Sequence, residues 1–269
     1  RLKIETYLKE ANCPDIVLAN VDVDFCRGFI DFLRYAKNGV RKDGSVISNG
    51  AAHHHQAVLN GALNKAVRDG ILSANPLKSI SSKEKYQPTE SMREYLTLEE
   101  MKAAMAAPCP HEDVKRAFLF CCFTGLRYSD VSALTWRNIK QINEGLVVSI
   151  QAMQKTGKQV TIPLNQSALK WLPDRNGCKP GQKVFDMTCL SACDRCLKKM
   201  AAAAGIKKNV SFHTARHSMA TLSLAAGGDL YTVGKLLGHT SINSTQVYAD
   251  VVMETKIEAV NRISDFFSN

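Results

Sequence analysis

The sequence lacks any long uninterrupted apolar segment. Its longest run made only of hydrophobic residues (Ala, Val, Ile, Leu, Met, Phe, Trp, Tyr or Cys) is Ala117–Phe123, seven residues in a chain of 269, whereas a helix that spans a bilayer needs about 20. We therefore expect neither a membrane anchor nor a membrane partner. Apolar residues still make up 45% of the chain and charged residues 22%, a balance that allows a substantial core and excludes wholesale disorder.

The sequence also lacks a basic tail that could explain its charge. Lysine and arginine total 35 against 25 acidic residues, for a net charge of +10. Positions 1–90 hold 13 basic and 10 acidic residues, and the remainder holds 22 and 15. Because the excess is spread over both parts, it favours a polyanionic partner over a targeting run. The chain opens on Arg1 rather than Met, so we expect a piece of a longer protein.

No paired framework of cysteines is present. Nine cysteines, an odd number at irregular spacings, favour reduced thiols in a cytoplasmic protein. The tightest cluster, Cys189, Cys193 and Cys196, contains one C-x-x-C but lacks a second pair at zinc-ribbon distance. On a helix these positions form one apolar stripe with Leu197 and Met200, which predicts core packing rather than a metal site.

The first part of the chain has a helical pattern. Phe25, Phe29, Phe32 and Leu33 share one helical face, and a second helix is predicted from about Ser48 to Asp69, with an apolar face of Val58, Ala62, Leu63 and Ala66. The polar stretch Pro76–Arg93 has two prolines and no periodicity. We predict a helical DNA-binding domain over residues 1–80, a linker over 81–93, and a second domain over 94–269 with a tail helix from about residue 251.

The second part mixes helices with a short β segment. Thr97–Glu100 has the T-x-x-E form of a capping box, and Val114–Phe123 predicts a buried helix. Two β-rich stretches at 146–150 and 159–163 flank a Gly-bearing turn, which predicts a hairpin. Further helices are predicted at 191–204, at 213–226, before Gly238 and from about Asn243. The predicted fold is mainly α with a small antiparallel sheet.

Four polar segments stand between these apolar stretches, and each carries cations or a tyrosine. They are Thr124–Asp130, His213–His217, Leu236–Ser241 and Gln246–Tyr248. Taken alone, each has an ordinary interpretation: an arginine after a helix break is usually in a surface salt bridge, and a tyrosine among valines usually lies in a core. The pair His213 and His217 has zinc-like spacing, but Thr214 stands where a metalloprotease helix has glutamate, so we expect no metal.

Together the segments resemble the signature of tyrosine site-specific recombinases, the phage integrase family. The matching residues are Arg127 in T-G-L-R, Lys155 in the hairpin turn, His213 and Arg216 as H-x-x-R, His239 in L-G-H, and Tyr248 at the nucleophile position. Asp130 falls where the family usually has an acid, often glutamate. His217 is expected to pack against the site residues rather than to contact the substrate. The catalytic resemblance covers about residues 93–269, and the helical region before Pro76 is similar to the family's core-binding domain.

The resemblance implies the role of each residue. Arg127 and Arg216 would bind the non-bridging oxygens of a phosphodiester, because a guanidinium fork matches two phosphate oxygens. Tyr248 would attack phosphorus with His213 as its base, and Lys155 would protonate the departing 5′-oxygen. The product would be a 3′-phosphotyrosyl enzyme, formed without metal, ATP or any cofactor.

The resemblance also implies partners and leaves alternatives open. Double-stranded DNA, a homotetramer on two synapsed sites and accessory DNA-bending proteins are expected, in the cytoplasm and at the nucleoid. Among recombinases, the chain looks most like integrases of integrative and conjugative elements. The alternatives are Xer-type resolution or DNA inversion, a DNA-binding relative that has lost strand exchange, and a type IB topoisomerase-like relative.

Overall fold

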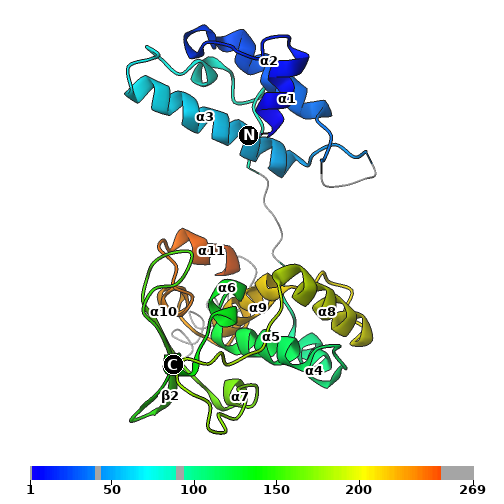
Figure 1. The fold of residues 1–269 in the computed structure, drawn as a ribbon, viewed down its shortest axis with the longest axis vertical. Coiled ribbons are helices and arrows are strands. Elements are labelled where there is room, and N and C mark those ends of the chain that lie inside the picture. The colour runs from blue at the N-terminus through cyan, green and yellow to red at the C-terminus, as the bar shows by residue number, and fades with distance from the viewer. Residues whose placement is uncertain (1, 40–43, 89–93, 250–269) are drawn as a thin grey trace, which may run out of the picture. The chain divides into compact units, whose positions relative to one another are not determined.

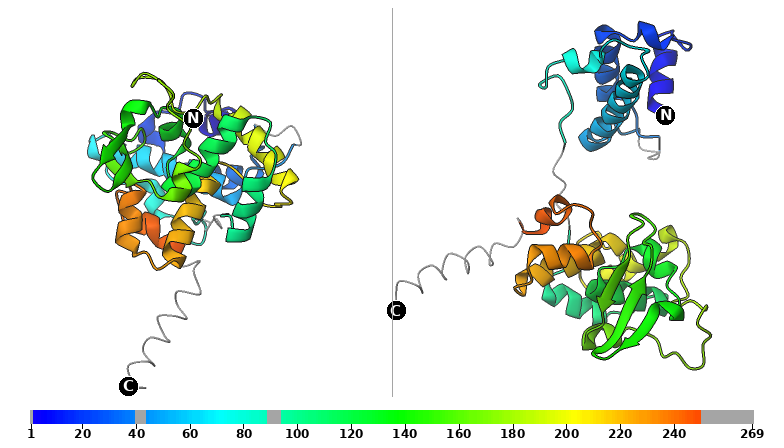
Figure 2. Two further views of the ribbon diagram at one scale, coloured as in Figure 1. Left: turned by 90° about the horizontal axis from the view of Figure 1, so that it is seen from below. Right: turned by 90° about the vertical axis from the view of Figure 1, so that its left-hand side faces the viewer.

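A computed structural model describes residues 2–39, 44–88 and 94–249 of the chain. The chain divides into two compact units, Arg1–Ser91 and Met92–Asn269, which are drawn in Figures 1 and 2. The tail helix predicted from about residue 251 lies outside the described residues. Within the described ranges, no helix combines the length and the apolarity that crossing a membrane requires.

The first unit consists of helices. Its elements are α1 (Leu2–Glu10), η1 (Leu18–Asn20), α2 (Val23–Tyr35), α3 (Asn49–Arg68) and η2 (Pro76–Ser79), where η denotes a 3₁₀ helix. Asp22 caps α2 by accepting from the N–H of Phe25, and Ser48 caps α3 by accepting from the N–H of Ala51. Two small core clusters hold the unit together: one contains Phe29, Leu33 and Ala52, and the other contains Cys26, Ile30, Leu63 and Leu77.

The predicted apolar face of α3 is wrong in part. Leu63 is buried, but Val58 and Ala62 are exposed. The buried stripe instead includes Gln56, whose side chain accepts from the N–H of Tyr86 at 2.9 Å and donates to its carbonyl at 3.2 Å. A polar side chain that satisfies both main-chain groups of one residue can lie in a core. Hydrophobicity alone therefore predicted the wrong residues for the buried face of α3.

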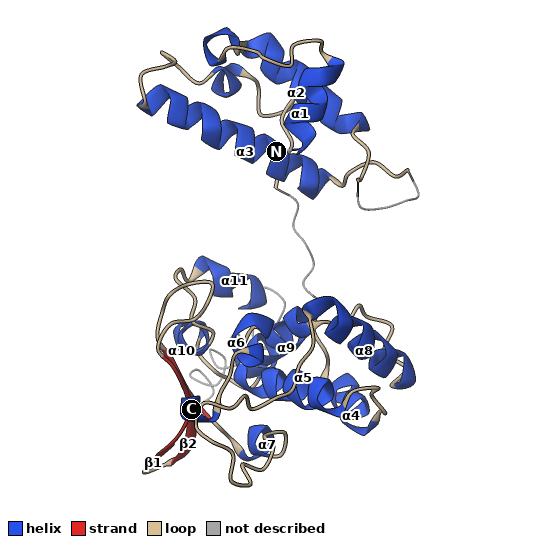
Figure 3. Ribbon diagram, in the orientation of Figure 1, coloured by secondary structure: helices blue, strands red, loops and turns tan. Residues whose placement is uncertain are grey.

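The second unit combines helices with a three-stranded antiparallel sheet in the order β1-β2-β3, drawn in red in Figure 3. Its helices are α4 (Leu98–Ala106), α5 (Glu112–Thr124), α6 (Tyr128–Ser132), η3 (Trp136–Asn138), α7 (Gln166–Leu169), α8 (Leu190–Ala203), α9 (Phe212–Ala225), α10 (Leu230–Leu236) and α11 (Asn243–Ala249), and its strands are β1 (Ile139–Ile142), β2 (Gly145–Ile150) and β3 (Val160–Pro163). The predicted fold class, mainly α with a small antiparallel sheet, is confirmed.

Two features of this unit differ from the prediction. The strand β1 was not predicted, because only Ile139 is partly buried and the next three residues are exposed, which leaves no alternating apolar pattern. Cys189 does not belong to the predicted cysteine stripe. It is the exposed N-cap of α8, whereas Cys193 is fully buried.

The core of the second unit fixes two helix ends that matter for the site. Helix α5 packs against α9, with the rings of Phe118 and Phe212 6.1 Å apart. Helix α5 stops at Gly125 (φ 69°), and the chain after α10 turns at Gly238 (φ 62°). A Cβ at Gly125 would lie 2.7 Å from Leu237, and one at Gly238 would lie 2.5 Å from Met153. Glycine is therefore favoured at both turns, because a positive φ is costly for other residues and an added Cβ would force these side chains to move.

Candidate active site

The side chain of Arg216 is buried between the C-terminal ends of α5 and α10. On α9 it is 3% exposed, and its Nη1 and Nη2 groups donate to the carbonyls of Gly125 and Leu237, each at 2.6 Å. These carbonyls end α5 and α10, where unpaired acceptors and the helix dipole favour a cation. Burial, followed by the charge of Arg127, lowers the pKa of Arg216 to about 10, so it stays cationic at neutral pH. Within the described part of the chain, these bonds use two of its five N–H groups.

Arg127 is the N-cap residue of α6, and Asp130 lies between its side chain and the hairpin loop. The Nη1 group of Arg127 lies 4.0 Å from Oδ2 of Asp130, whose side chain is 1% exposed. The other oxygen of Asp130 accepts from the N–H of Gln154 at 3.0 Å. Because Gln154 precedes Lys155, this buried carboxylate connects the arginine to the loop that carries the lysine.

His213 lies in the field of three cations. It shares the N-terminal part of α9 with Arg216 and His217, at helical spacings that place the three on one face. Desolvation is the main reason that the pKa of His213 is lowered, and the charges of Lys155, Arg216 and Arg127 lower it further. His213 is therefore neutral at neutral pH, although the Lys155 loop lies close enough to influence it.

Tyr248 on α11 is buried, with 2% of its surface exposed. Its hydroxyl lies 2.8 Å from Nδ1 of His217. Its ring is nearly parallel to that of His239, at 8° and a centroid separation of 6.5 Å. The tyrosine is thus held between two histidines that come from different helices and loops.

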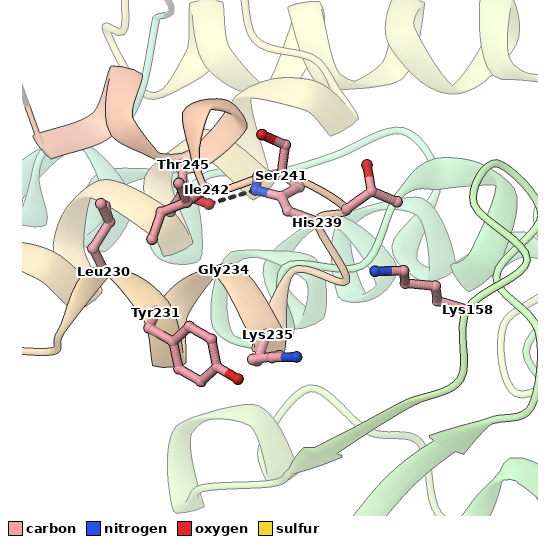
Figure 4. A pocket seen from close by; sticks show the side chains of 10 residues that line it. Lys158, Leu230, Tyr231, Gly234, Lys235, His239, Ser241, Ile242 and Thr245 are labelled. Carbon is pink, nitrogen blue, oxygen red and sulfur yellow. Dashed lines mark hydrogen bonds between the residues drawn. The ribbon is translucent and has the colours of Figure 1, made fainter.

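His239, whose ring lies nearly parallel to that of Tyr248, also lines a small pocket. The pocket has a volume of about 130 Å³ and lies between the hairpin loop, α10 and the start of α11. Figure 4 shows the amino groups of Lys158 and Lys235 pointing toward one another across it, and the hydrogen bond that joins Nδ1 of His239 to Oγ1 of Thr245 at 2.7 Å. The pocket is therefore cationic as well as adjacent to the tyrosine.

The second unit matches a family of known function. Residues 94–255 match the phage integrase family, and residues 2–87 match the phage integrase SAM-like domain. The chain belongs to the phage integrase family. Two curated relatives of this phage integrase family member are tyrosine recombinases. XerD of Chlorobaculum tepidum is 30% identical over 203 residues. XerC of Caldanaerobacter subterraneus subsp. tengcongensis is 31% identical over 212 residues.

These matches cover most of this chain but less of the relatives. They include 67% of this chain for the XerD relative and 71% for the XerC relative, yet 64% and 56% of those proteins. The chain therefore spans less than two thirds of the length of either relative.

Solved structures of the phage integrase family share the fold. The XerH site-specific recombinase bound to a palindromic difH substrate superimposes with a TM-score of 0.68 at 21% identity, covering 96% of this chain and 76% of XerH. The Tn1549 transposon integrase in complex with circular intermediate DNA gives a TM-score of 0.66 at 14% identity, covering 92% of this chain and 87% of that one. At these identities the likeness concerns the fold alone.

The structure gathers the residues that the sequence singled out into one site of this family member. After burial, the charges of the two arginines lower the pKa of His213, and that of Arg127 lowers the pKa of Arg216. Tyr248 contacts one histidine and stacks near another. The exposed Lys155 influences the cluster through its charge. In the described ranges, no group of three or more His, Cys, Asp or Glu side chains is placed to hold a metal.

Sequence reasoning missed two contacts: that of His217 with Tyr248, and that of Thr245 with His239. His217 was expected only to pack against the site residues. Thr245 lies three residues before Tyr248 in the sequence, a spacing that places both on one face of a helix. That spacing was the available signal for a buried polar residue beside Tyr248.

Proposed function

We propose that this chain is a site-specific recombinase that breaks and rejoins double-stranded DNA through a 3′-phosphotyrosyl intermediate. The observation that carries the proposal is a buried tyrosine, Tyr248, whose hydroxyl is held 2.8 Å from His217 beside the buried Arg216. Tyr248 belongs to a small core cluster with residues of α9 and α10, and its hydroxyl, bonded to His217 near the charge of Arg216, is also suited to attack a phosphodiester.

The two arginines supply the charge that this attack requires. Cleavage of a phosphodiester builds negative charge on the non-bridging oxygens, and preorganised donors that meet this charge accelerate such steps by about 10²–10³ each. Arg216 is held by hydrogen bonds to two carbonyls, and Arg127 lies 4.0 Å from the carboxylate of Asp130. We propose that both guanidinium groups bind the scissile phosphate, with His213 and His239 as further donors.

His217 is the group best placed to prepare the nucleophile. A phenol has a pKa near 10, so at neutral pH it needs a base. His213 was predicted as that base, but among the described residues no hydrogen bond joins it to Tyr248, and His217 occupies that place. We propose that His217 orients the hydroxyl and receives its proton, while neutral His213 hydrogen-bonds a phosphate oxygen.

The reaction then balances without a cofactor. The Tyr248 oxygen forms a bond to phosphorus, the bond from phosphorus to the 5′-oxygen breaks, and Lys155 gives a proton to that oxygen. The products are a 5′-hydroxyl and a phosphotyrosine. Because the phosphoester bond is conserved, a 5′-hydroxyl from a second strand can reverse the step, which gives strand exchange without ATP.

The proposed role of Lys155 predicts a chemical rescue. Lys155→Ala should slow cleavage by about 10²–10⁴, the usual contribution of general acid catalysis, with little loss of binding. Replacing the bridging 5′-oxygen by sulfur should restore the rate, because a thiol with a pKa of about 8.5 leaves without a proton. Cleavage rates on both substrates test this. Rescue of Lys158→Ala instead would move the acid to that residue, and rescue of neither would contradict a lysine acid in this loop.

The charges around His213 predict a measurable titration. Its pKa lies below the ordinary 6.5 because of desolvation and then Lys155, Arg216 and Arg127. His213 therefore binds a proton more readily in the unfolded chain than in the folded one. Its contribution to the free energy of unfolding is fully present above pH 6.5 and is lost as the pH falls below that value. NMR titration should place His213 below 6.5 in the wild type and closer to it in Lys155→Met. The exposed Lys140 on β1 is the control, and an equal shift in Lys140→Met would contradict the local origin.

The finer proposals concern what the recombinase does in the cell. We propose that it integrates or excises a mobile element, acting as a homotetramer on two synapsed sites, with accessory DNA-bending proteins, in the cytoplasm and at the nucleoid. The identity to relatives named XerC and XerD favours a second candidate, Xer-type resolution. We also propose that residues 1–80 and 94–269 act as two DNA-binding domains joined by the linker 81–93.

One experiment tests the activity and separates the candidates. The protein is incubated with genomic DNA of its source in EDTA, and the covalently attached DNA is sequenced. We expect attachment at 3′-phosphates in a defined sequence, and the ends of a mobile element would support integration. A single chromosomal site would support resolution, and attachment without sequence preference would support a topoisomerase. No covalent DNA, or loss of attachment in EDTA, would contradict the proposed chemistry.

A further inference from the structure

A fully buried hydroxyl lies beside the proposed site and has no part in the mechanism above. Thr245 is 0% exposed, and its Oγ1 is 2.7 Å from Nδ1 of His239. Thr245 and Tyr248 are the two buried residues of the short helix α11, whose other residues are exposed or half-buried. One side chain of this helix thus binds His239 while the other binds His217.

The neighbouring helix is shaped to admit this threonine. A Cβ on Gly234 of α10 would lie 2.9 Å from Oγ1 of Thr245, closer than two such atoms approach without a shift. Gly234 has an ordinary helical conformation, since it is absent from the positive-φ glycines. The glycine, which weakens a helix interior by about 1 kcal/mol, therefore makes space for the hydroxyl rather than for a turn.

The hydroxyl constrains the proton arrangement of His239. In the described part of the chain, Nδ1 of His239 is the one hydrogen-bond partner of the Thr245 side chain. If a neutral His239 carried its proton on Nδ1, the buried hydroxyl proton would be left without an acceptor, which costs about 1–3 kcal/mol. The favourable arrangement has the hydroxyl donating to Nδ1, which places the ring proton on Nε2.

We propose that Thr245 is a positioning residue that keeps His239 in its Nε2–H form, so that His239 can donate to the scissile phosphate. The proposal rests on the proposed function for its consequence in DNA cleavage. Because Thr245 and the nucleophile share α11, the same hydrogen bond joins the orientation of His239 to the docking of the tyrosine. Outer partners of this kind typically change activity by about 10–100-fold when removed, as known for histidines that bind metals.

The kinetic test removes the hydroxyl while keeping the shape. Thr245→Val should slow covalent trapping of DNA by about 10–100-fold at saturating DNA, and Thr245→Ser should recover most of that loss. Thr135→Val is the matched control, since the Thr135 hydroxyl donates to Asn138 at 2.9 Å in the cap of η3. A Val variant as fast as the wild type, or a Ser variant as slow as Val, would overturn the proposal.

A second readout does not require activity. In ¹⁵N-histidine-labelled protein without DNA, with the signal assigned through His239→Gln, we expect His239 to be protonated at Nε2 and unprotonated at Nδ1 near neutral pH. Thr245→Val should allow a mixture of tautomers. A wild-type Nδ1–H tautomer would overturn the proposal. Failure of the wild type to trap DNA would contradict the proposed function and leave the tautomer measurement to decide this one.

Discussion

Replacing Tyr248 with phenylalanine is expected to abolish covalent attachment to DNA while leaving DNA binding intact. The substitution removes one oxygen from a ring that is 2% exposed, so the packing of α11 is retained. The lost hydrogen bond to His217 should lower the free energy of unfolding by about 0.5–1.5 kcal/mol. Without the phenolic oxygen no phosphotyrosine can form, so the expected loss is complete rather than partial.

The measurement uses a nicked substrate that traps the intermediate, analysed on denaturing gels, with binding followed on native gels. Tyr95→Phe is the matched control, because Tyr95 lies in the same unit and the contact of Lys208 with its carbonyl does not need the hydroxyl. We expect the control to trap DNA at the wild-type rate. A Tyr248→Phe protein that still traps DNA would place the nucleophile elsewhere.

The order of the motifs could be predicted from sequence because each is a short local pattern. Arg127, the pair His213 and Arg216, and Tyr248 stand in recognisable contexts, and helical or hairpin periodicity indicates the elements that carry them. The fold class followed for the same reason, since the apolar run of α5 and the β-rich stretches around the hairpin turn are also local patterns.

The parts that sequence did not predict depend on contacts between distant segments. The partners of Arg216 are main-chain carbonyls at positions 125 and 237. Every residue has such a carbonyl, so the amino-acid sequence does not indicate which ones accept from the arginine. Gln56 lies in a core because it pairs with the main chain of Tyr86. The role of His217 likewise depends on where α11 docks, since it lies 31 positions from Tyr248.

This placement also explains why the site tolerates so much positive charge. Each arginine has negative charge near it: two helix-end carbonyls accept from Arg216, and the buried carboxylate of Asp130 lies 4.0 Å from Arg127. Burial, and after it the charge of Arg127, still lowers the pKa of Arg216, so the cluster is suited to an anion. A scissile phosphate would relieve the repulsion between the two arginines, and its extra charge in the transition state would relieve it further.

The second large effect is expected at Arg216, because its charge and its shape have separate functions. Lysine keeps the charge, but one ammonium group cannot reach both carbonyls and still present two parallel N–H groups to a phosphate. We expect Arg216→Lys to slow cleavage by about 10²–10³ at saturating DNA. The loss of a charged hydrogen bond should lower the free energy of unfolding by about 1.5–3 kcal/mol, which urea denaturation can measure.

Two comparisons separate chemistry from folding in this prediction. Arg195→Lys, at an exposed position on α8, should leave both the cleavage rate and the stability unchanged. The sulfur-bridged substrate that is expected to rescue Lys155→Ala should not rescue Arg216→Lys, because the proposed role of the arginine is at the non-bridging oxygens and sulfur replaces the bridging one. Rescue by sulfur would show that Arg216 assists the leaving group. A wild-type rate in Arg216→Lys would show that the site needs only a charge at this position, and the two carbonyls would then serve stability alone.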